Sequence, residues 1–505
     1  MARKKKMKRL KVLLVYPNLM LVSLLPNNIA LLAACLKKQG HDVKLFDTTL
    51  YRTANKTNDE MRVERMQVRK FNIEDAKLEI KEQDVYDDFA KVVREYSPDL
   101  IGVSVVDDTV EMGLNLIKHA DCKNIPVIFG GVYTTFNPEK LIKEVDIICI
   151  SEGEEALAEI CSCLKNSLPY DGIRNLWVKK ESGTVIKNPL RPPVDINTLP
   201  FEDFTIFEKK RVFRPMQGKM LATIPINFDR GCPYKCTFCA APNLCNLYKE
   251  DNFSYYRVKS MERIYQEMKY QMKNQPVSFF YFNSETFLTM PLKRLKEFAE
   301  MYSEFRLPFW CQTRIETVTE EKVKILRQMN CDRISIGLEH GNENFRKKML
   351  NKNFTNEQVI QAFEILNKYD IKISVNNMIG FPDETRELVF DTIKLNRRIK
   401  ADSINGFVFQ PYSGTRLRDY SIKKGYLSDR EAIVANPVGS PIGSSVLNMP
   451  QFTKDEIEGL LRTFVLYVRM PEQYFPKIKK AEKLNKKGNL ALEELREAFF
   501  NKYFN

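Results

Sequence analysis

Three cysteines in the middle of the chain have a spacing suited to binding metal. Cys232, Cys236 and Cys239 form a C-x3-C-x2-C pattern, directly after an apolar segment at 223–228 that is typical of a strand. A structural zinc site closes around four protein ligands, whereas an iron–sulfur cubane held by three cysteines leaves one iron free to bind a small molecule. The pattern predicts a metal centre of one of these two kinds.

The other cysteines bear on that choice. Cys245 lies six residues after the pattern and could complete a zinc site, so the zinc alternative stays open. The rest are scattered through apolar segments, where we expect them to pack as small hydrophobic side chains. Eleven cysteines in 505 residues do not make a disulfide scaffold, which would be short and dense in cysteine.

The segments around the cysteines alternate between strand and helix. After the strand at 223–228, strands are predicted at 278–282, 309–313, 333–337, 372–379 and 404–409, each separated from the next by a helical pattern. Six such units form a partial β/α barrel, in which functional groups gather at the carboxyl ends of the strands. Those ends carry Glu285, Arg314, Glu339, His340, Gly380 and Gln410.

The first third of the chain reads as a doubly wound α/β domain. Apolar strands at 11–16, 43–46, 100–105, 127–129 and 147–150 alternate with helices, which indicates a parallel sheet covered on both faces. Ligands of such sheets bind beyond the carboxyl ends of the strands. No G-x-G-x-x-G motif follows the first strand, so a nicotinamide or flavin dinucleotide is not predicted. The candidate residues at these ends are Tyr16, Asn18, Asp47, Ser104, Gly130, Gly131, Glu152 and Gly153.

The cysteine loop, with an aromatic residue before its last cysteine, resembles that of the radical S-adenosylmethionine (SAM) superfamily. The resemblance implies that Cys232, Cys236 and Cys239 bind a [4Fe-4S] cluster whose fourth iron chelates SAM. It also assigns SAM contacts to five further residues. These are Phe238 near the adenine, Glu285 near the amine in an Asn-Ser-Glu that replaces the usual Gly-Gly-Glu, Arg314 at the carboxylate, Glu339 at the ribose and Gly380 in the adenine pocket.

The order of the domains is similar to that of the cobalamin-dependent radical SAM subfamily. The resemblance spans about residues 10 to 425 and implies that the eight candidate residues of the first domain bind cobalamin. The D-x-H-x-x-G motif, whose histidine replaces the lower ligand of cobalt in many cobalamin domains, is absent. Members of this subfamily without the motif hold cobalamin without such a ligand.

The resemblance implies a C-methyltransferase. In this hypothesis a 5′-deoxyadenosyl radical from SAM removes hydrogen from an unactivated carbon, methylcobalamin supplies the methyl group, and a second SAM remethylates the cobalamin. One alternative is an oxidative cyclase or rearrangement enzyme with the same cofactors and no methyl transfer. Another is a zinc-stabilised protein that binds nucleic acid through the basic residues at 3–11. A small-molecule or lipid substrate and a reductant such as flavodoxin or ferredoxin are the expected partners.

Charge and hydropathy narrow the remaining possibilities. The net charge is +14, but no basic and aromatic pattern of a nucleic-acid module accompanies it, so no nucleic-acid partner is expected. Residues 12–36 lack charge and include a lipoprotein-like Leu32-Ala33-Ala34-Cys35 box, yet Pro17 and Pro26 split this stretch into pieces too short to span a bilayer. We therefore expect a cytoplasmic protein without a membrane span.

We expect four parts along the chain. Residues 1–168 form the doubly wound, flavodoxin-like domain, 169–215 a linker, 216–422 the partial (β/α)6 barrel, and 423–505 a helical domain that caps the barrel. Within the last part, a loop rich in Gly, Pro and Ser is predicted at 436–445, and helices at 454–469, 471–483 and 490–503.

Overall fold

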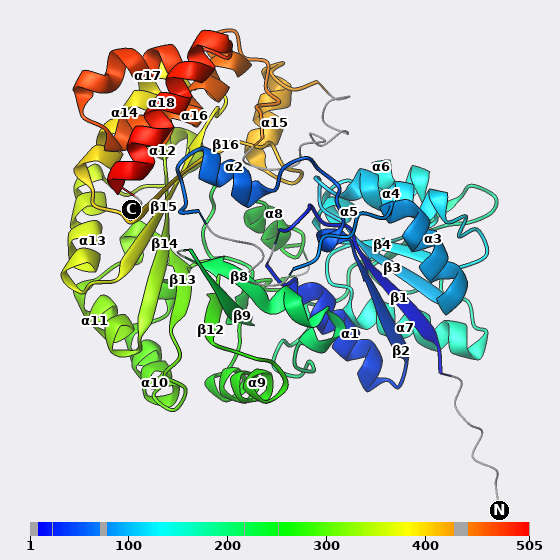
Figure 1. Ribbon diagram of the computed structural model, residues 1–505. Coiled ribbons are helices and arrows are strands. Elements are labelled where there is room, and N and C mark those ends of the chain that lie inside the picture. The colour runs from blue at the N-terminus through cyan, green and yellow to red at the C-terminus, as the bar shows by residue number, and fades with distance from the viewer. Residues whose placement is uncertain are drawn as a thin grey trace, which may run out of the picture.

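The computed structural model describes residues 9–22, 24–70, 78–216, 218–250, 252–428 and 443–503. Two seven-stranded sheets dominate them and lie side by side (Figure 1). The first has the order β2-β1-β3-β4-β5-β6-β7, and its first five strands are parallel. These five are β1 Lys11–Tyr16, β2 Asp42–Asp47, β3 Leu100–Ser104, β4 Val127–Gly130 and β5 Ile147–Cys149. The 2-1-3-4-5 order is that of the flavodoxin-like fold and confirms the predicted fold class.

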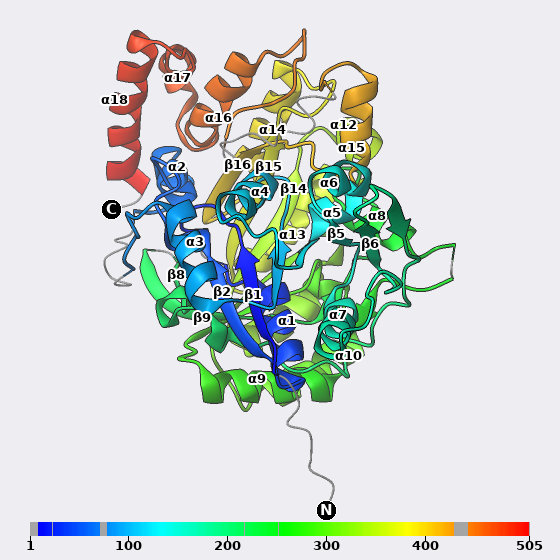
Figure 2. The same ribbon diagram turned by 90° about the vertical axis from the view of Figure 1, so that its right-hand side faces the viewer.

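Helices cover both faces of the first sheet, as its apolar strands require (Figure 2). Buried side chains of β1 alternate between two clusters, with Val12 and Leu14 in one and Leu13 and Val15 in the other. The helices are α1 Asn27–Lys38, α3 Val85–Tyr96, α4 Val110–His119, α5 Val132–Phe136, α6 Pro138–Glu144 and α7 Glu154–Asn166. The lipoprotein-like box thus lies within α1, where Ala33 and Ala34 are buried.

The expected linker contributes to the first sheet. Strands β6 Leu176–Lys179 and β7 Val185–Lys187 extend it as an antiparallel hairpin beside β5. The strands contain only four and three residues, and the polar turn between them hides their weak alternation in the sequence. Within the expected linker, only the residues after β7 connect the two domains without joining the first sheet.

The second sheet is the partial barrel, ordered β16-β15-β14-β13-β12-β9-β8. Its six parallel strands are β9 Lys219–Asn227, β12 Phe279–Asn283, β13 Phe309–Thr313, β14 Cys331–Glu339, β15 Lys372–Ile379 and β16 Ser403–Val408, as predicted. An additional strand, β8 Phe213–Met216, pairs antiparallel with β9. The outer helices are α9 Met261–Asn274, α10 Leu292–Tyr302, α11 Glu320–Gln328, α12 Glu343–Leu350, α13 Asn356–Lys368 and α14 Arg386–Arg398.

A segment of the first domain reaches the open edge of the barrel. Helix α2 Asn58–Glu64 begins in a capping box of Thr57 with Glu60 and lies beside β16 (Figure 1). From this segment Arg62 donates to the Asn405 side chain at 3.2 Å, and Gln67 donates to the carbonyl of Gly406 at 2.8 Å. Residues 48–70, which we call the crossing segment, therefore satisfy part of an edge strand that would otherwise face solvent.

The C-terminal helices pack against the end of the barrel sheet. Helix α15 Arg416–Lys423 follows β16, and α16 Lys454–Arg469 packs between β16 and α14 through buried Ile457, Leu461 and Phe464. Helices α17 Phe475–Ala481 and α18 Lys486–Tyr503 complete the group. The predicted loop at 436–445 lies mostly outside the described residues. No helix among the described residues is both long and apolar enough to cross a membrane.

Candidate functional site

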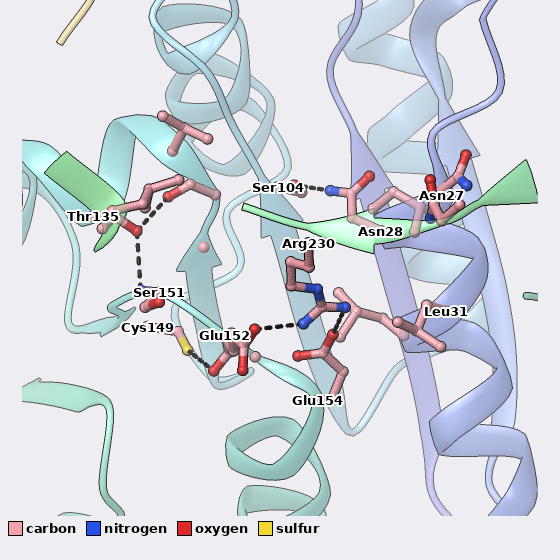
Figure 3. Close-up of a pocket in the computed structure, with 18 of the residues that line it drawn as sticks. Asn27, Asn28, Leu31, Ser104, Thr135, Cys149, Ser151, Glu152, Glu154 and Arg230 are labelled. Atoms are coloured by element: carbon pink, nitrogen blue, oxygen red, sulfur yellow. Dashed lines mark hydrogen bonds and ion pairs between the residues drawn. The ribbon is translucent and has the colours of Figure 1, made fainter. Parts of the chain in front are cut away.

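A cavity of about 490 Å³ lies where the carboxyl ends of the two sheets meet (Figure 3). Its walls come from α1, from the ends of β3, β4 and β5, and from the cysteine loop and the end of β12. Five of the predicted cobalamin residues line it, together with one predicted SAM residue. These six are Ser104, Gly130, Gly131, Glu152, Gly153 and Glu285.

The first-domain wall is built from backbone and small polar groups. Gly131 has a φ of +105°, and a Cβ at this position would lie 2.3 Å from the carbonyl oxygen of Val105. Only glycine fits this approach. The Thr135 hydroxyl accepts from the backbone N–H of Ser151 at 3.0 Å, and Ser104 accepts from the Asn28 side chain at 3.0 Å (Figure 3).

Ion pairs join the two domains at this cavity. Arg230, two residues before Cys232, donates to Glu152 at 2.7 Å and to Glu154 at 2.7 Å (Figure 3). Arg257 also pairs with Glu152. Although burial alone would raise the pKa of Glu152, the two guanidinium groups hold that pKa below its usual value. Glu152, which the sequence predicts to contact cobalamin, thus holds the cysteine loop against the first domain in this structure.

The three cysteines lie on the loop after the short strand β10 Asp229–Arg230, each partly exposed. Burial raises the pKa of Cys232 to about 12 and that of Cys239 to about 11. Arg314, at the end of β13, donates to the Cys236 sulfur at 2.8 Å. The same guanidinium also pairs with Glu316. Its bond to the Cys236 sulfur places Arg314 at the cysteine loop.

Acidic groups stand beside this loop, Glu285 just after β12 and Asp229 in β10. Glu285 lines the cavity, and its side chain is exposed there. Desolvation by the surrounding protein nevertheless raises the pKa of its carboxyl. Burial raises the pKa of Asp229 to about 6, against a hydrogen bond from Ser284 that lowers it. Carboxyls of this kind suit an ammonium group or a polar ligand in the cavity.

The end of β14 brings Glu339 and Phe238 together through a lysine. Lys352 donates to Glu339 at 3.0 Å, and its ammonium lies 5.7 Å from the centre of the Phe238 ring. Glu339 has a φ of +64°, rare for a non-glycine residue, and the pairing of β14 with β15 shifts register next to it. Strain of this kind is concentrated at functional sites.

A buried carboxylate holds the loop that contains Gly380. Glu384 accepts from the backbone N–H groups of Gly380, at 2.5 Å, and Phe381, at 3.0 Å. It also contacts His340 at 3.0 Å, and both side chains are inaccessible to solvent. His340 therefore supports the loop from within the protein and does not face the cavity.

Three predicted cobalamin residues lie elsewhere. Asn18 bonds the hydroxyls of Thr48 and Thr49 at 2.7 Å each, and Asp47 pairs with Arg211 at 2.9 Å. Burial raises the pKa of the neighbouring Tyr16 to about 12. These residues stabilise the start of the crossing segment and do not line the cavity described above.

Several site residues were missed from the sequence. Asn28 and Leu31 enter from α1, and Lys352 comes from the connection between α12 and α13. Arg230 could have been found, because it stands directly before the Gly231-Cys232 pair of the motif. Glu384 carried no signal, since its role depends on the path of the backbone at Gly380.

The residues fit the expected cofactors. Among the described residues, no group of three His, Cys, Asp or Glu side chains is placed to hold a single ion. Cys232, Cys236 and Cys239 are free thiols on one loop, which is the kind of ligand that an iron–sulfur cluster takes. Cys245 instead contacts the Cys232 carbonyl at 3.8 Å. The glycine-rich wall leaves backbone and apolar surface free for a large, flat ligand, and the described residues that line the cavity include no histidine.

Residues 226–395 match the family model of the radical SAM superfamily, and residues 22–161 match that of the B12 binding domain. The chain thus contains a radical SAM domain preceded by a B12 binding domain. In this radical SAM protein, the two matched regions contain the cysteine loop and the glycine-rich wall of the cavity. The family match replaces the hypothesis of a zinc-stabilised nucleic-acid-binding protein.

Relatives of this radical SAM protein include an uncharacterized methyltransferase of Pyrococcus horikoshii, 26% identical over 75% of this chain and 80% of the relative. The anaerobic magnesium-protoporphyrin IX monomethyl ester cyclase of Rubrivivax gelatinosus is 24% identical over 62% of this chain and 57% of its own length. Among solved structures, the radical SAM methyltransferase TsrM of Kitasatospora setae, with cobalamin and a [4Fe-4S] cluster bound, shares the fold. Its TM-score is 0.65 at 16% identity, over 97% of this chain and all of the other.

Proposed function

We propose that this enzyme is a cobalamin-dependent radical SAM C-methyltransferase acting on an unactivated carbon. The observation that carries the proposal is a cavity shared by the two domains, because the glycine-rich wall of the B12 binding domain faces Arg230 and Gly231, directly before the cysteines, and Glu285 across it. A methyl donor and a site of hydrogen abstraction must both reach one substrate carbon. The P. horikoshii methyltransferase relative supports the same assignment.

In this proposal the cofactors supply radical formation and a transferable methyl group, and the chain positions them. Cys232, Cys236 and Cys239 would hold a [4Fe-4S] cluster. Arg314, which donates to the Cys236 sulfur, would lower the negative charge felt at that ligand. Lys352 fixes the Glu339 carboxylate for ribose hydroxyls, and Glu384 fixes the backbone of Gly380 and Phe381 beside the adenine.

On the cobalamin side, the wall from Ser104 to Gly153 would contact the corrin mainly through backbone groups. The pair of Arg230 with Glu152 and Glu154 keeps the cysteine loop at a fixed distance from that wall. Such fixed geometry serves a methyl transfer, since misplacing reacting groups by about 1 Å can cost a hundredfold in rate. Tyr16, Asn18 and Asp47 would act at most through the crossing segment.

The proposal also concerns the cellular setting. A reduced cluster requires an electron donor such as flavodoxin or ferredoxin, and free thiols and cluster persist in a reducing compartment. We infer a cytoplasmic enzyme, and a small-molecule or lipid substrate.

The test uses the full chain, reconstituted anaerobically with iron, sulfide and cobalamin. The enzyme is incubated with reductant, methyl-deuterated SAM and extracts of small molecules and lipids. A product that gains one trideuteromethyl group in place of hydrogen, formed together with 5′-deoxyadenosine, supports the methyltransferase. A product that loses hydrogen or rearranges without gaining the label would establish the cyclase alternative, which the R. gelatinosus relative favours.

A further inference from the structure

A second cavity, of about 460 Å³, lies at the opposite end of the barrel strands from the cysteine loop. Its walls come from the amino-terminal halves of β13, β14, β15 and β16, from β8, from the crossing segment and from the C-terminal helices α16 and α18. It shares no lining residue with the cofactor cavity. None of the residues assigned to cofactors lies in it.

This second cavity, which we call the lower cavity, is strongly basic. Its lining contains seven basic side chains against three acidic ones. The basic ones are Arg62, Arg69, Arg214, Arg333, Lys372, Lys400 and Arg469, and the acidic ones are Asp59, Asp370 and Asp402. The imbalance is local, because the cofactor cavity contains one arginine, Arg230, and that arginine is paired twice.

Each of the three acidic groups in the lining already has a partner of its own. Asp59 pairs with Arg62 at 3.1 Å, and Asp402 accepts from the backbone N–H of Ile373 at 2.8 Å. Asp370 lies 3.7 Å from Arg327, which is not part of the lining. Asp59 thus balances Arg62, and Asp332, outside the lining, pairs with Lys372 at 3.2 Å, but none of these carboxylates forms an ion pair with Arg214 or Arg333, where an excess of positive charge remains.

Two arginines carry that excess. Among the described residues, neither Arg214 nor Arg333 forms an ion pair or side-chain hydrogen bond, and Arg214 Nη1 and Arg333 Nε are buried without a partner. Burial lowers the pKa of both groups, although Asp59 opposes this at Arg214 and Asp332 and Asp402 oppose it at Arg333, and the Arg62 guanidinium lowers each pKa further. Arg62 therefore lies close enough to repel both arginines, and all three line the same cavity.

An aromatic platform orients Arg214. Its guanidinium lies 4.8 Å from the ring centre of Trp310, which stacks on Tyr281 with ring centres 4.3 Å apart. Trp310 is fixed in turn by its N–H bond to the Ser335 hydroxyl at 2.8 Å. Stacking holds the planar guanidinium in place while leaving its edge N–H groups free to donate.

A buried charge without a partner costs free energy, and an arginine fork matches the oxygens of phosphate in pairs. We propose that the lower cavity binds a phosphate or diphosphate group, which Arg62, Arg214 and Arg333 would contact together. This goes beyond the proposed function, since the site is separate from the methyl-transfer cavity. From Arg333 to Glu339 along β14 is six residues, or about 20 Å at about 3.3 Å per residue.

The test measures thermal melting of the purified full chain with inorganic pyrophosphate and, at equal ionic strength, with sodium chloride. We expect pyrophosphate to raise the melting temperature more than chloride does. Arg214→Met and Arg333→Gln should each weaken pyrophosphate binding by at least about tenfold, as expected for loss of a hydrogen bond between charged groups. Arg94→Met, on the exposed face of α3, removes the same charge and should bind as the wild type does.

The variants are expected to fold, because each removes an uncompensated charge from a partly buried position. If either variant unfolds, the other carries the test. Equal stabilisation by pyrophosphate and chloride, or pyrophosphate binding unchanged in both variants, overturns the proposal. Comparing inorganic phosphate with hexyl phosphate identifies the source. Tighter binding of the alkyl ester indicates an amphiphilic phosphate that uses Met216, Trp310 and Phe499, whereas equal binding indicates free phosphate.

Discussion

The two cavities at opposite ends of the barrel differ in how their charges are balanced, although their volumes are similar, about 490 and 460 Å³. At the cofactor end, Arg230 pairs with Glu152 and Glu154, and Lys352 pairs with Glu339. At the lower end, Arg214 and Arg333 have no carboxylate partner among the described residues. The basic groups named at the first cavity are thus neutralised within the protein, and Arg214 and Arg333 at the second are not.

The difference separates two uses of arginine. A guanidinium that is neutralised within the protein fixes the distance between elements, which suits a site where cofactors and substrate must meet. A buried guanidinium without a partner is unfavourable in free energy, and a bound anion lowers that cost. The following predictions test this distinction at the level of single side chains.

The largest effect is expected at the cysteine loop. Cys232→Ala, Cys236→Ala or Cys239→Ala removes a cluster ligand, so SAM cleavage should fall at least about a thousandfold, because the cofactor carries the chemistry. Reductive formation of 5′-deoxyadenosine by reconstituted protein measures this. Cys245→Ala is the matched control and should keep both iron and activity. Undiminished cleavage in any of the three variants would refute the cluster assignment.

Arg230→Met should destabilise the fold by roughly 3 kcal/mol, because it leaves the buried Glu154 carboxylate without its partner. Urea denaturation measures the loss. The same substitution at Arg52, whose pair with Glu82 is exposed on both sides, should leave the midpoint close to that of the wild type. If Arg230→Met is as stable as wild type, the cofactor end is not held by paired charge.

Glu384→Gln should cost about 1–3 kcal/mol, because an amide cannot accept as well from the N–H groups of Gly380 and Phe381 while contacting His340. We also expect weaker SAM binding, measured by equilibrium dialysis, with pyrophosphate binding at the lower cavity unchanged. A loss of both affinities together would show that the two ends are not independent.

The smallest effect concerns Asp108, in the contact between the domains, where Tyr412 donates to its carboxylate at 3.1 Å. Burial, and to a lesser degree Asp107, raises the pKa of Asp108 to about 7. The native state then holds this proton more tightly than the unfolded state, so stability should fall as pH rises from about 4 to about 7.

The expected size of that fall is on the order of 1 kcal/mol, because partial exposure screens the shift. Asp108→Asn should flatten this part of the stability profile and gain stability above pH 7. Melting temperatures across the pH range, with and without the substitution, measure it. A profile identical in both proteins would contradict the assignment.

The sequence predicted the regular part of the fold. The apolar segments that became β1, β3 and β13 are continuous, and their helices have clear stops, so periodicity was enough. The hairpin β6–β7 and helix α2 were missed. Both are short and polar, and both exist because a sheet edge is available to pair with, which a local pattern cannot reveal.

The residues of the candidate site also divide into those that the sequence predicted and those that it did not. Ser104, Gly131 and Glu285, predicted from their places at strand ends, line one cavity because topology alone brings strand ends together. Arg230 and Lys352 were missed as site residues because their partners lie far away in the sequence. Tyr16, Asn18 and Asp47, also predicted from strand ends, are not among the lining residues of that cavity. The first two strands end beside the crossing segment, and these three residues support that segment instead.

Each domain contributes side chains to a cavity wall of the other, and the crossing segment is the contribution of the first domain. The first domain lends Arg62 to a cavity of the barrel, and the barrel lends Arg230 to the wall of the first domain. A chimera that exchanges one domain with a relative would therefore break contacts at both ends of the barrel unless residues 48–70 were exchanged to match. The two halves have to be inherited, and engineered, as one unit.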